Sequence, residues 1–188
     1  RFYQIFMYLE FPGPLNRACP YDAPRRGDWL EVVLPTTKEI YMLPELKIGN
    51  LVAKYPIIQG GMGVGISLSS LAGAVAKAGG IGIISAAQPG WRDPEFARDP
   101  LSANLRALAF HIRRAKEISN GGIIGVNIMC ALTHYEEYVR CCIENGADLI
   151  ISGAGLPTDL PKYTAGSSIK LAPIVSPPRT AKVLLKFI

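Results

Sequence analysis

The sequence contains little charge, few cysteines and only two histidines. Of its 188 residues, 19% are charged, four are Cys and two are His. The cysteines form neither a CxxC pair nor a Cys/His spacing typical of zinc, which argues against a disulfide scaffold and a metal site. No basic run is interleaved with aromatic residues. The net charge of +5 is therefore compatible with a phosphate-bearing ligand, but we expect no nucleic acid partner.

The longest weakly charged stretch is not typical of a membrane span. Lys77 is the only charged residue between Tyr55 and Trp91, yet nine of these 37 residues are Gly. Glycine at this density, with Gln and Ser in the first half, favours two buried strands around one helix. Residues 1–11 are rich in aromatics and lack the cleavage pattern of a signal peptide. We therefore expect no membrane partner and a cytoplasmic location.

Apolar side chains make up 49% of the chain, and they become regularly patterned only after about residue 41. Residues 1–41 hold eight of the sixteen aromatic residues and show no sustained period. Lys38-Glu39 can be encoded as a purine-rich ribosome-binding sequence just before Met42. We therefore interpret residues 1–41 as a non-native or disordered leader and residues 42–188 as the folded region. A genuine N-terminal extension is the alternative.

After Met42, apolar runs that read as strands alternate with segments that read as helices. The predicted strands are 55–60, 81–85, 123–129, 147–152 and 171–175. The predicted helices run from 67 or 69 to Gly79, from 99 to about 118, from 133 to 145, and from 180 onward, with at most a short helix in 157–168. This alternation predicts a parallel sheet covered by helices.

Local signals mark the ends of the first two helices. Ser67 or Ser69 is expected to cap the first helix, and Asp99-Pro100 supplies an N-cap and a first-turn proline for the second. Glycine pairs end both helices. We expect the first helix to bury one face, formed by Leu71, Ala74, Val75 and Ala78.

The glycine-rich loop after the first predicted strand argues against an open dinucleotide-binding sheet. The glycines of residues 60–65 do not complete the pattern G-x-G-x-x-G, because Ile66 or Leu68 stands where the third glycine belongs. No Walker A spacing occurs either. A loop without Cβ atoms still lets a ligand approach the backbone closely. An open doubly wound sheet and a (β/α)8 barrel are the two closures that the pattern leaves.

Four motifs of the chain resemble the nitronate monooxygenase (2-nitropropane dioxygenase) family. They are PIIQGGM at 56–62, LAGAV with AGGIG at 71–82, GVNIM at 125–129 and ISGAGLP at 151–157. The FMN-dependent enoyl-ACP reductases share this superfamily and much of the pattern. The resemblance covers residue 43 to the end. It implies an α/β fold, an FMN-binding (β/α)8 TIM barrel, of which only the first five strands or so lie in this chain.

The resemblance also implies where FMN binds, because ligands of such barrels lie at the carboxyl ends of the strands. In the family, backbone and an apolar side chain after the first strand lie against the flavin ring. The amide of Asn127 can donate and accept, which suits a flavin edge or a ribityl hydroxyl. The residues expected to bind the cofactor are Gly60, Gly61, Met62, Asn127, Met129, Ser152, Gly153, Val175 and Ser176.

No catalytic residue is assigned within the chain. The resemblance implies a catalytic His in a glycine-rich motif after the sixth strand, and phosphate-binding loops after the seventh and eighth. Neither His111 nor His134 matches that motif, so we expect the catalytic His beyond Ile188. We interpret His134 as an exposed residue at a helix start, His111 as an outer-face residue, and Cys130 as a small buried hydrophobe.

The sequence therefore predicts an FMN-dependent nitronate monooxygenase, which oxidises alkyl nitronates with O2 to a carbonyl compound and nitrite. For this chain alone we expect no turnover and weak or no FMN binding. The first alternative is an FMN-dependent enoyl-ACP reductase that uses NAD(P)H. The second is a non-enzymatic half-barrel that dimerises to complete its sheet, so a homodimer stays open as a partner.

Overall fold

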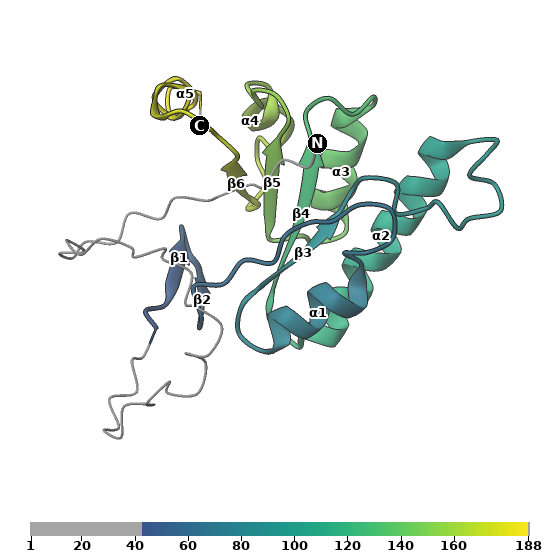
Figure 1. Ribbon diagram of the computed structural model, residues 1–188, viewed down its shortest axis with the longest axis horizontal. Helices are drawn as coiled ribbons and strands as arrows, with labels where there is room; N and C mark the ends of the chain where they lie inside the picture. The colour runs from purple at the N-terminus through teal and green to yellow at the C-terminus, as the bar shows by residue number, and fades with distance from the viewer. Residues whose placement is uncertain (1–42, 188) are drawn as a thin grey trace, which may run out of the picture. The chain divides into compact units, whose positions relative to one another are not determined.

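The computed structural model describes residues 43–187 (Figure 1). The expected leader, residues 1–41, lies outside the described residues, as do Met42 and Ile188. Within the described range, no helix combines the length and the apolarity that a membrane crossing requires.

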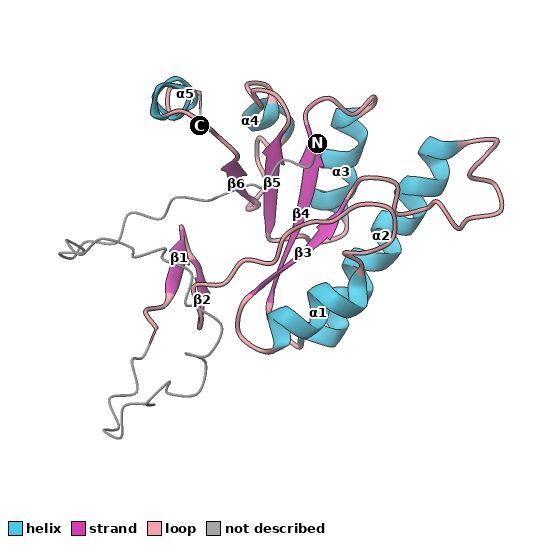
Figure 2. Cartoon of the chain, in the orientation of Figure 1, coloured by secondary structure: helices cyan, strands magenta, loops and turns pink. Residues whose placement is uncertain are grey.

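A four-stranded parallel sheet forms the centre of the fold, with the strand order β3-β4-β5-β6. The strands are β3 (Ile81–Ser85), β4 (Ile123–Met129), β5 (Leu149–Gly153) and β6 (Lys170–Pro173). The helices are α1 (Ser69–Lys77), α2 (Pro100–Ser119), α3 (Tyr135–Glu144), α4 (Leu160–Tyr163) and α5 (Pro178–Leu184). Helices alternate with the strands along the chain (Figure 2). This is one side of a (β/α)8 barrel, the predicted fold class.

Most predicted elements are confirmed within a few residues, because glycines and an Asp-Pro step mark their ends. Asp99 caps α2 as predicted, since its carboxylate accepts from the backbone N–H of Ser102 at 3.1 Å. At the other end, Asn120 adopts a left-handed conformation with φ 50° and Gly121 follows with φ 92°. The segment 157–168 contains only the one-turn helix α4.

The first predicted strand, residues 55–60, forms less ladder than expected. It runs parallel to the edge of β3 but makes only one bridge, between Ile58 and Ile81. Around that bridge Gln59 N–H donates to Ile81 O at 3.0 Å, and Ile81 N–H donates to Ile57 O at 2.9 Å. Beyond it the backbone leaves the sheet, because the side chain of Gln59 bonds to Ile83 in place of the backbone.

The prediction for α1 was wrong in its cap and in its buried face. Leu68 precedes the helix and no side chain caps it. The buried residues of α1 are Ser69, Ala72, Gly73 and Ala76. Small residues occupy the buried face because α1 lies very close to α2 and β3. A Cβ at Gly73 would lie 2.6 Å from the Cβ of Ile118, and one at Gly82 would lie 1.9 Å from the Ala72 carbonyl oxygen.

A short antiparallel hairpin, β1 (Leu46–Ile48) and β2 (Leu51–Ala53), was not predicted. Its signal is the Gly49-Asn50 pair between two apolar runs, with Gly49 at φ 60°. Figure 1 shows the hairpin on one side of the sheet and α1, α2 and α3 on the other.

The sheet therefore has a helix face and an inner face, each with its own apolar cluster. The helix-face cluster contains Ile84, Ile124, Val126, Ile128 and Ile150 together with buried residues of α1, α2 and α3. The inner-face cluster is smaller, with Ile81, Ile83, Leu149 and Ala53 at its centre, and the hairpin packs against it. Period-two alternation along each strand sends neighbouring side chains to opposite faces.

Candidate functional site

On the inner face, side chains change from apolar to polar toward the carboxyl ends of the strands. Paired residues of a parallel sheet lie in rows on the same face. The first row pairs Ile81 with Ile123, and the second joins Ile83, Gly125 and Leu149. The third row joins Ser85, Asn127 and Ile151. Asn127 thus lies where ligands of such barrels bind.

Gly61 lies beside Asn127, although 66 positions separate them in the sequence. The amide Nδ2 of Asn127 donates to the carbonyl oxygen of Gly61 at 3.5 Å, a long hydrogen bond. A Cβ at Gly61 would lie 2.6 Å from the Cβ of Asn127, so this contact requires glycine. The structure brings together two of the predicted site residues.

Two backbone N–H groups and one amide oxygen at this edge are free within the described part of the chain. The N–H groups of Gly60 and Gly61 and the Oδ1 of Asn127 have no hydrogen-bond partner there. Among the described residues, and chain neighbours aside, no atom lies within 4 Å of a Cβ placed at Gly60, so they leave space open beside the backbone. The edge therefore offers two donors and one acceptor to a planar polar ligand.

The hydroxyl of Ser67 organises the glycine-rich loop from within. Ser67 is fully buried, and its Oγ accepts from Met62 N–H at 2.9 Å and donates to Gly60 O at 3.1 Å. Its backbone closes the same loop, since Ser67 N–H donates to Met62 O at 3.0 Å. Ser85 N–H donates to Ser67 O at 3.0 Å, which ties the loop to the end of β3.

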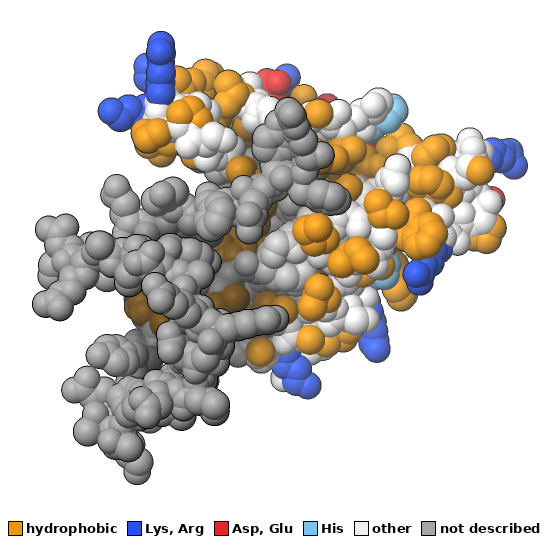
Figure 3. Space-filling model, in the orientation of Figure 1, with side chains coloured by type: hydrophobic (Ala, Val, Ile, Leu, Met, Phe, Trp, Pro, Cys, Tyr) orange, Lys and Arg blue, Asp and Glu red, His pale blue; other side chains and the backbone are white. Residues whose placement is uncertain are grey.

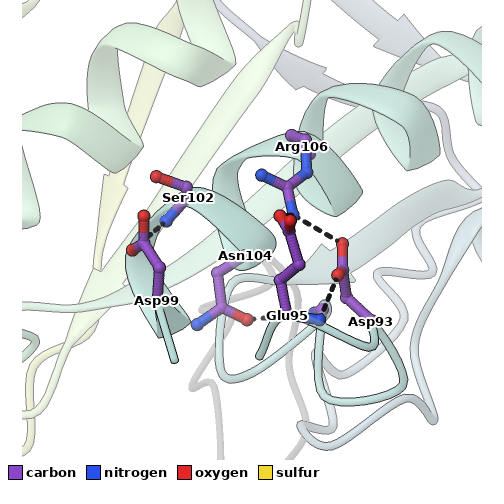
Figure 4. A network of polar contacts seen from close by, with 7 residues as sticks. Asp93, Glu95, Asp99, Ser102, Asn104 and Arg106 are labelled. Carbon is purple, nitrogen blue, oxygen red and sulfur yellow. Dashed lines mark hydrogen bonds and ion pairs between the residues drawn. The ribbon is translucent and has the colours of Figure 1, made fainter. Parts of the chain in front are cut away.

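The loop between β3 and α2 forms a wall beside the glycine-rich loop. Val64 N–H donates to Ala87 O at 2.9 Å, and a Cβ at Gly65 would lie 2.4 Å from the indole nitrogen of Trp91. Figure 4 shows how the wall is anchored to α2. Arg106 pairs with Asp93 at 2.9 Å and with Glu95 at 3.0 Å.

Two more side chains fix the base of that wall. The buried Asn104 accepts from Gly90 N–H at 3.0 Å, and Asp93 accepts from Glu95 N–H at 2.9 Å. The hydrogen bond from Glu95 N–H and the Arg106 guanidinium lower the pKa of the Asp93 carboxyl. Polar contacts therefore hold the exposed part of the wall, while Pro89 and Gly90 are buried at its base.

Met129 and Gly153 face each other in the register of β4 and β5, on the inner face. Met129 is exposed, as are Met62, Val64 and Leu156 on the neighbouring loops. Figure 3 shows hydrophobic side chains exposed on the described part of the visible face. Val175 and Ser176 follow β6; Val175 is half-buried and Ser176 is exposed. Among the described residues, the only side-chain hydrogen bond of Asn127 goes to Gly61, so none joins it to Val175 or Ser176.

Ser152 belongs to the other face of the sheet. Its hydroxyl is fully buried and donates to Ile128 O at 2.9 Å, while the Tyr135 hydroxyl lies 2.7 Å away. The thiol of Cys130 lies 3.3 Å from the same oxygen. Burial raises the pKa of Tyr135 to about 12, so this phenol stays protonated. The predicted cofactor contact of Ser152 would therefore fall to its backbone.

The two histidines lie apart from the Gly61–Asn127 edge. His134 is exposed at the start of α3, as predicted, with Nδ1 3.0 Å from a Glu137 carboxylate oxygen. His111 was predicted on the outer face, but it is half-buried between α1 and α2. Its Nδ1 lies 3.0 Å from the Ser69 hydroxyl, and burial lowers its pKa.

The sequence reasoning missed two residues of this site, Gln59 and Ser67. The signal that could have found Gln59 is an amide side chain within an apolar strand, which is also the feature that selected Asn127. Ser67 was interpreted as a helix cap, since a serine before a helix is usually one. Its true partners lie earlier in the chain, at Gly60 and Met62.

The residues at this edge fit the ring end of FMN. A flavin ring presents flat apolar faces and an edge of donors and acceptors. The exposed Met62 and Met129 could hold such a ring by apolar contact, and Gly60, Gly61 and Asn127 carry polar groups that suit its edge. Within residues 43–187, no cluster of three His, Cys, Asp or Glu side chains could hold a metal ion.

Comparison with protein families agrees with the resemblance that the sequence motifs show. The family model described as nitronate monooxygenase matches residues 45–186 of the chain. Among curated proteins, none matches the chain significantly.

Solved structures share the fold of the described region. FabK from Thermotoga maritima is 27% identical with a TM-score of 0.56, over 71% of this chain and 38% of that one. Nitroalkane oxidase from Streptomyces ansochromogenes is 16% identical with a TM-score of 0.55, over 70% of this chain and 43% of that one. The chain thus spans well under half the length of either protein.

Proposed function

Because this chain belongs to the nitronate monooxygenase family, we propose that it is part of an FMN-dependent oxidoreductase that acts on alkyl nitronates. The observation that carries the proposal is the meeting of Gly61 and Asn127 at the carboxyl edge of the sheet. Open space and free hydrogen-bonding groups coincide there with exposed apolar side chains. The predicted cofactor residues Gly60, Gly61, Met62, Asn127 and Met129 are retained in the proposal.

Each of these residues has a defined role in binding. The N–H groups of Gly60 and Gly61 donate to acceptors on the ring edge, and Asn127 Oδ1 accepts from a ring N–H. Met62 and Met129 cover apolar ring surface and exclude water from it. These groups hold and orient the ring; none of them is placed to abstract a proton.

FMN held by these residues would supply the redox chemistry by which electrons pass from the nitronate to O2, so that two alkyl nitronates and one O2 would give two carbonyl compounds and two nitrite ions, with O2 as the source of the carbonyl oxygen. The chain's own contribution is electrostatic and geometric. Its residues set the hydrogen bonds at the ring edge and the apolar contact on the ring face. We assign no catalytic role to His111 or His134, because among the described residues their ring nitrogens bond Ser69 and Glu137 and not the Gly61–Asn127 edge.

A second candidate is an FMN-dependent enoyl-ACP reductase, which would use NAD(P)H. The observation that favours it is the 27% identity to FabK over 71% of this chain. Both activities need the ring at the same edge, so the residues described here do not separate them.

Parallel assays of the two reactions test the proposal. The protein is expressed from the complete reading frame that contains this chain and assayed with an alkyl nitronate and O2, following nitrite. A second assay supplies crotonyl thioester with NAD(P)H. Nitrite formation that depends on FMN supports the proposal, and NAD(P)H oxidation without nitrite would replace it by the reductase. Residues 1–188 alone are the reference, for which we expect no turnover.

A further inference from the structure

The side chain of Gln59 takes the place of a stretch of backbone in the sheet. In a parallel ladder, the N–H and the C=O of one residue bond two residues of the partner strand that are two positions apart. Every second residue of the strand repeats this pattern. Gln59 N–H donates to Ile81 O at 3.0 Å as that pattern requires. The next bonds of the ladder would join Gln59 O to Ile83 N–H, and Gly61 N–H to Ile83 O.

Both of these bonds are made by the Gln59 carboxamide instead. Ile83 N–H donates to Gln59 Oε1 at 3.3 Å, and Gln59 Nε2 donates to Ile83 O at 3.0 Å. A primary amide carries the same donor and acceptor as a peptide group, so it satisfies both backbone groups of Ile83. The Gly61 N–H is therefore not required by β3.

Ser67 secures the backbone that has been released. Gln59 Nε2 also donates to Ser67 Oγ at 3.1 Å, and that oxygen in turn bonds Gly60 O and Met62 N–H. The hydroxyl is fully buried, so these bonds are shielded from water. Together, Gln59 and Ser67 define the path of Gly60 and Gly61 away from the sheet. We name this pair the Gln59–Ser67 clip.

We propose that the Gln59–Ser67 clip is a positioning device that keeps the Gly60 and Gly61 N–H groups out of the β-ladder and directed toward the cofactor. The proposal rests on the proposed function, because it takes FMN as the ligand of that edge. Neither side chain needs to touch the cofactor. The clip acts through the backbone that it holds, and its loss changes how the ring edge is bound.

The test compares the clip with a matched buried hydrogen bond. Gln59→Leu removes the peptide-like amide, and Ser67→Ala removes the hydroxyl. The control is Ser69→Ala, because Ser69 is also buried at the start of α1 but bonds His111 instead of the loop. FMN affinity, the visible absorption spectrum of bound FMN and thermal unfolding are measured for the protein expressed from the complete reading frame.

We expect Gln59→Leu and Ser67→Ala to weaken FMN binding about tenfold each and to alter the flavin spectrum. Ser69→Ala should lower the melting temperature about as much as Ser67→Ala does, while FMN affinity and the flavin spectrum stay unchanged. Should Gln59→Leu not fold, Gln59→Glu replaces it. That variant keeps the size and the acceptor for Ile83 N–H but cannot donate to Ile83 O when ionised.

Two results overturn the inference. One is wild-type FMN affinity and spectrum in folded Gln59 and Ser67 variants; the other is an equal loss of affinity in Ser69→Ala, which would reduce the clip to general stability. Failure of the proposed function looks different. In that case the unaltered protein binds no FMN, and the inference fails with it.

Discussion

The helix face and the inner face of the sheet are built from the same four strands, yet they differ in how they are covered. On the helix face, buried side chains extend along the strands from Ile124 to Ile128 and pack against α1, α2 and α3. On the inner face, the apolar cluster fills the first two rows and continues into the third only at Ile151 and Ala172, while Ser85 and Asn127 bring polar groups into that row. The helix face is therefore covered along its length, whereas the inner face is apolar at one end and partly polar at the other, where we propose that FMN binds.

Glycines show the same contrast. On the helix face, a Cβ at Gly82 would meet the carbonyl oxygen of Ala72, a backbone atom at 1.9 Å. On the inner face, a Cβ at Gly61 would meet the side chain of Asn127 at 2.6 Å. The overlap at Gly82 is with the backbone of a packed helix and is the more severe, whereas the overlap at Gly61 is with one Cβ and can be relieved if the glycine-rich loop shifts.

The largest expected effect is that of Gly82→Ala, which we expect to cost more than about 3 kcal/mol in the free energy of unfolding. Gly61→Ala should cost less, about 1–2 kcal/mol, because its overlap of 2.6 Å is milder than the 1.9 Å at Gly82 and Gly61 lies in a loop, but it should weaken FMN binding. Chemical denaturation and FMN titration of both variants measure the difference. Equal destabilisation by the two substitutions would contradict the division between the faces.

The next largest effect compares two asparagines, one at the proposed binding edge and one on the helix side, and separates FMN binding from stability. Asn127→Ala should change the free energy of unfolding by less than about 1 kcal/mol, since its one hydrogen bond is 3.5 Å long. It should weaken FMN binding about tenfold, because the ring edge loses its acceptor.

The matched control for Asn127 is Asn145→Ala. Asn145 ends α3 and donates to Cys141 O at 2.8 Å, on the helix side of the sheet. We expect a loss of about 1 kcal/mol in stability and unchanged FMN affinity. A weaker FMN complex in this variant would show that the two faces are coupled.

The sequence predicts the helix face better than the inner face, because the signals of the helix face are local. Apolar runs and the Asp99-Pro100 step locate β3, β4 and α2 without reference to the rest of the chain. The buried side of α1 is different. Leu71 is more apolar than Ala72, but close packing on β3 and α2 selects the smaller residue.

The site is predicted in part, as residue types rather than as partners. Gly61 and Asn127 are found because glycines and an amide stand at strand ends. The pairing of Gln59 with Ile83 spans 24 positions and depends on the chain leaving the sheet, which no local pattern encodes. Ser152 was expected on the ligand side. A run such as LIIS is apolar on both faces, so its sequence does not show which side chains point to which face of the sheet.

The smallest expected effect is a pH dependence that arises on the helix face alone. Burial lowers the pKa of His111, whose usual value is 6.5. As pH falls below that value, the unfolded chain takes up the proton more readily than the folded one. The contribution of His111 to stability is therefore complete above pH 6.5 and is lost as pH falls toward the folded pKa.

Thermal unfolding between about pH 7.5 and about pH 5.5 separates histidine from the carboxyl groups, which titrate at lower pH, and the two single variants then separate His111 from His134. The melting temperature should fall across that interval in the unaltered protein. His111→Gln should flatten the slope, since glutamine can keep a hydrogen bond to Ser69 but does not titrate. The control is His134→Gln, because His134 is exposed and its partner is Glu137 on the same helix. A slope that survives His111→Gln and disappears in His134→Gln would move the pH dependence from the α1–α2 contact to the start of α3.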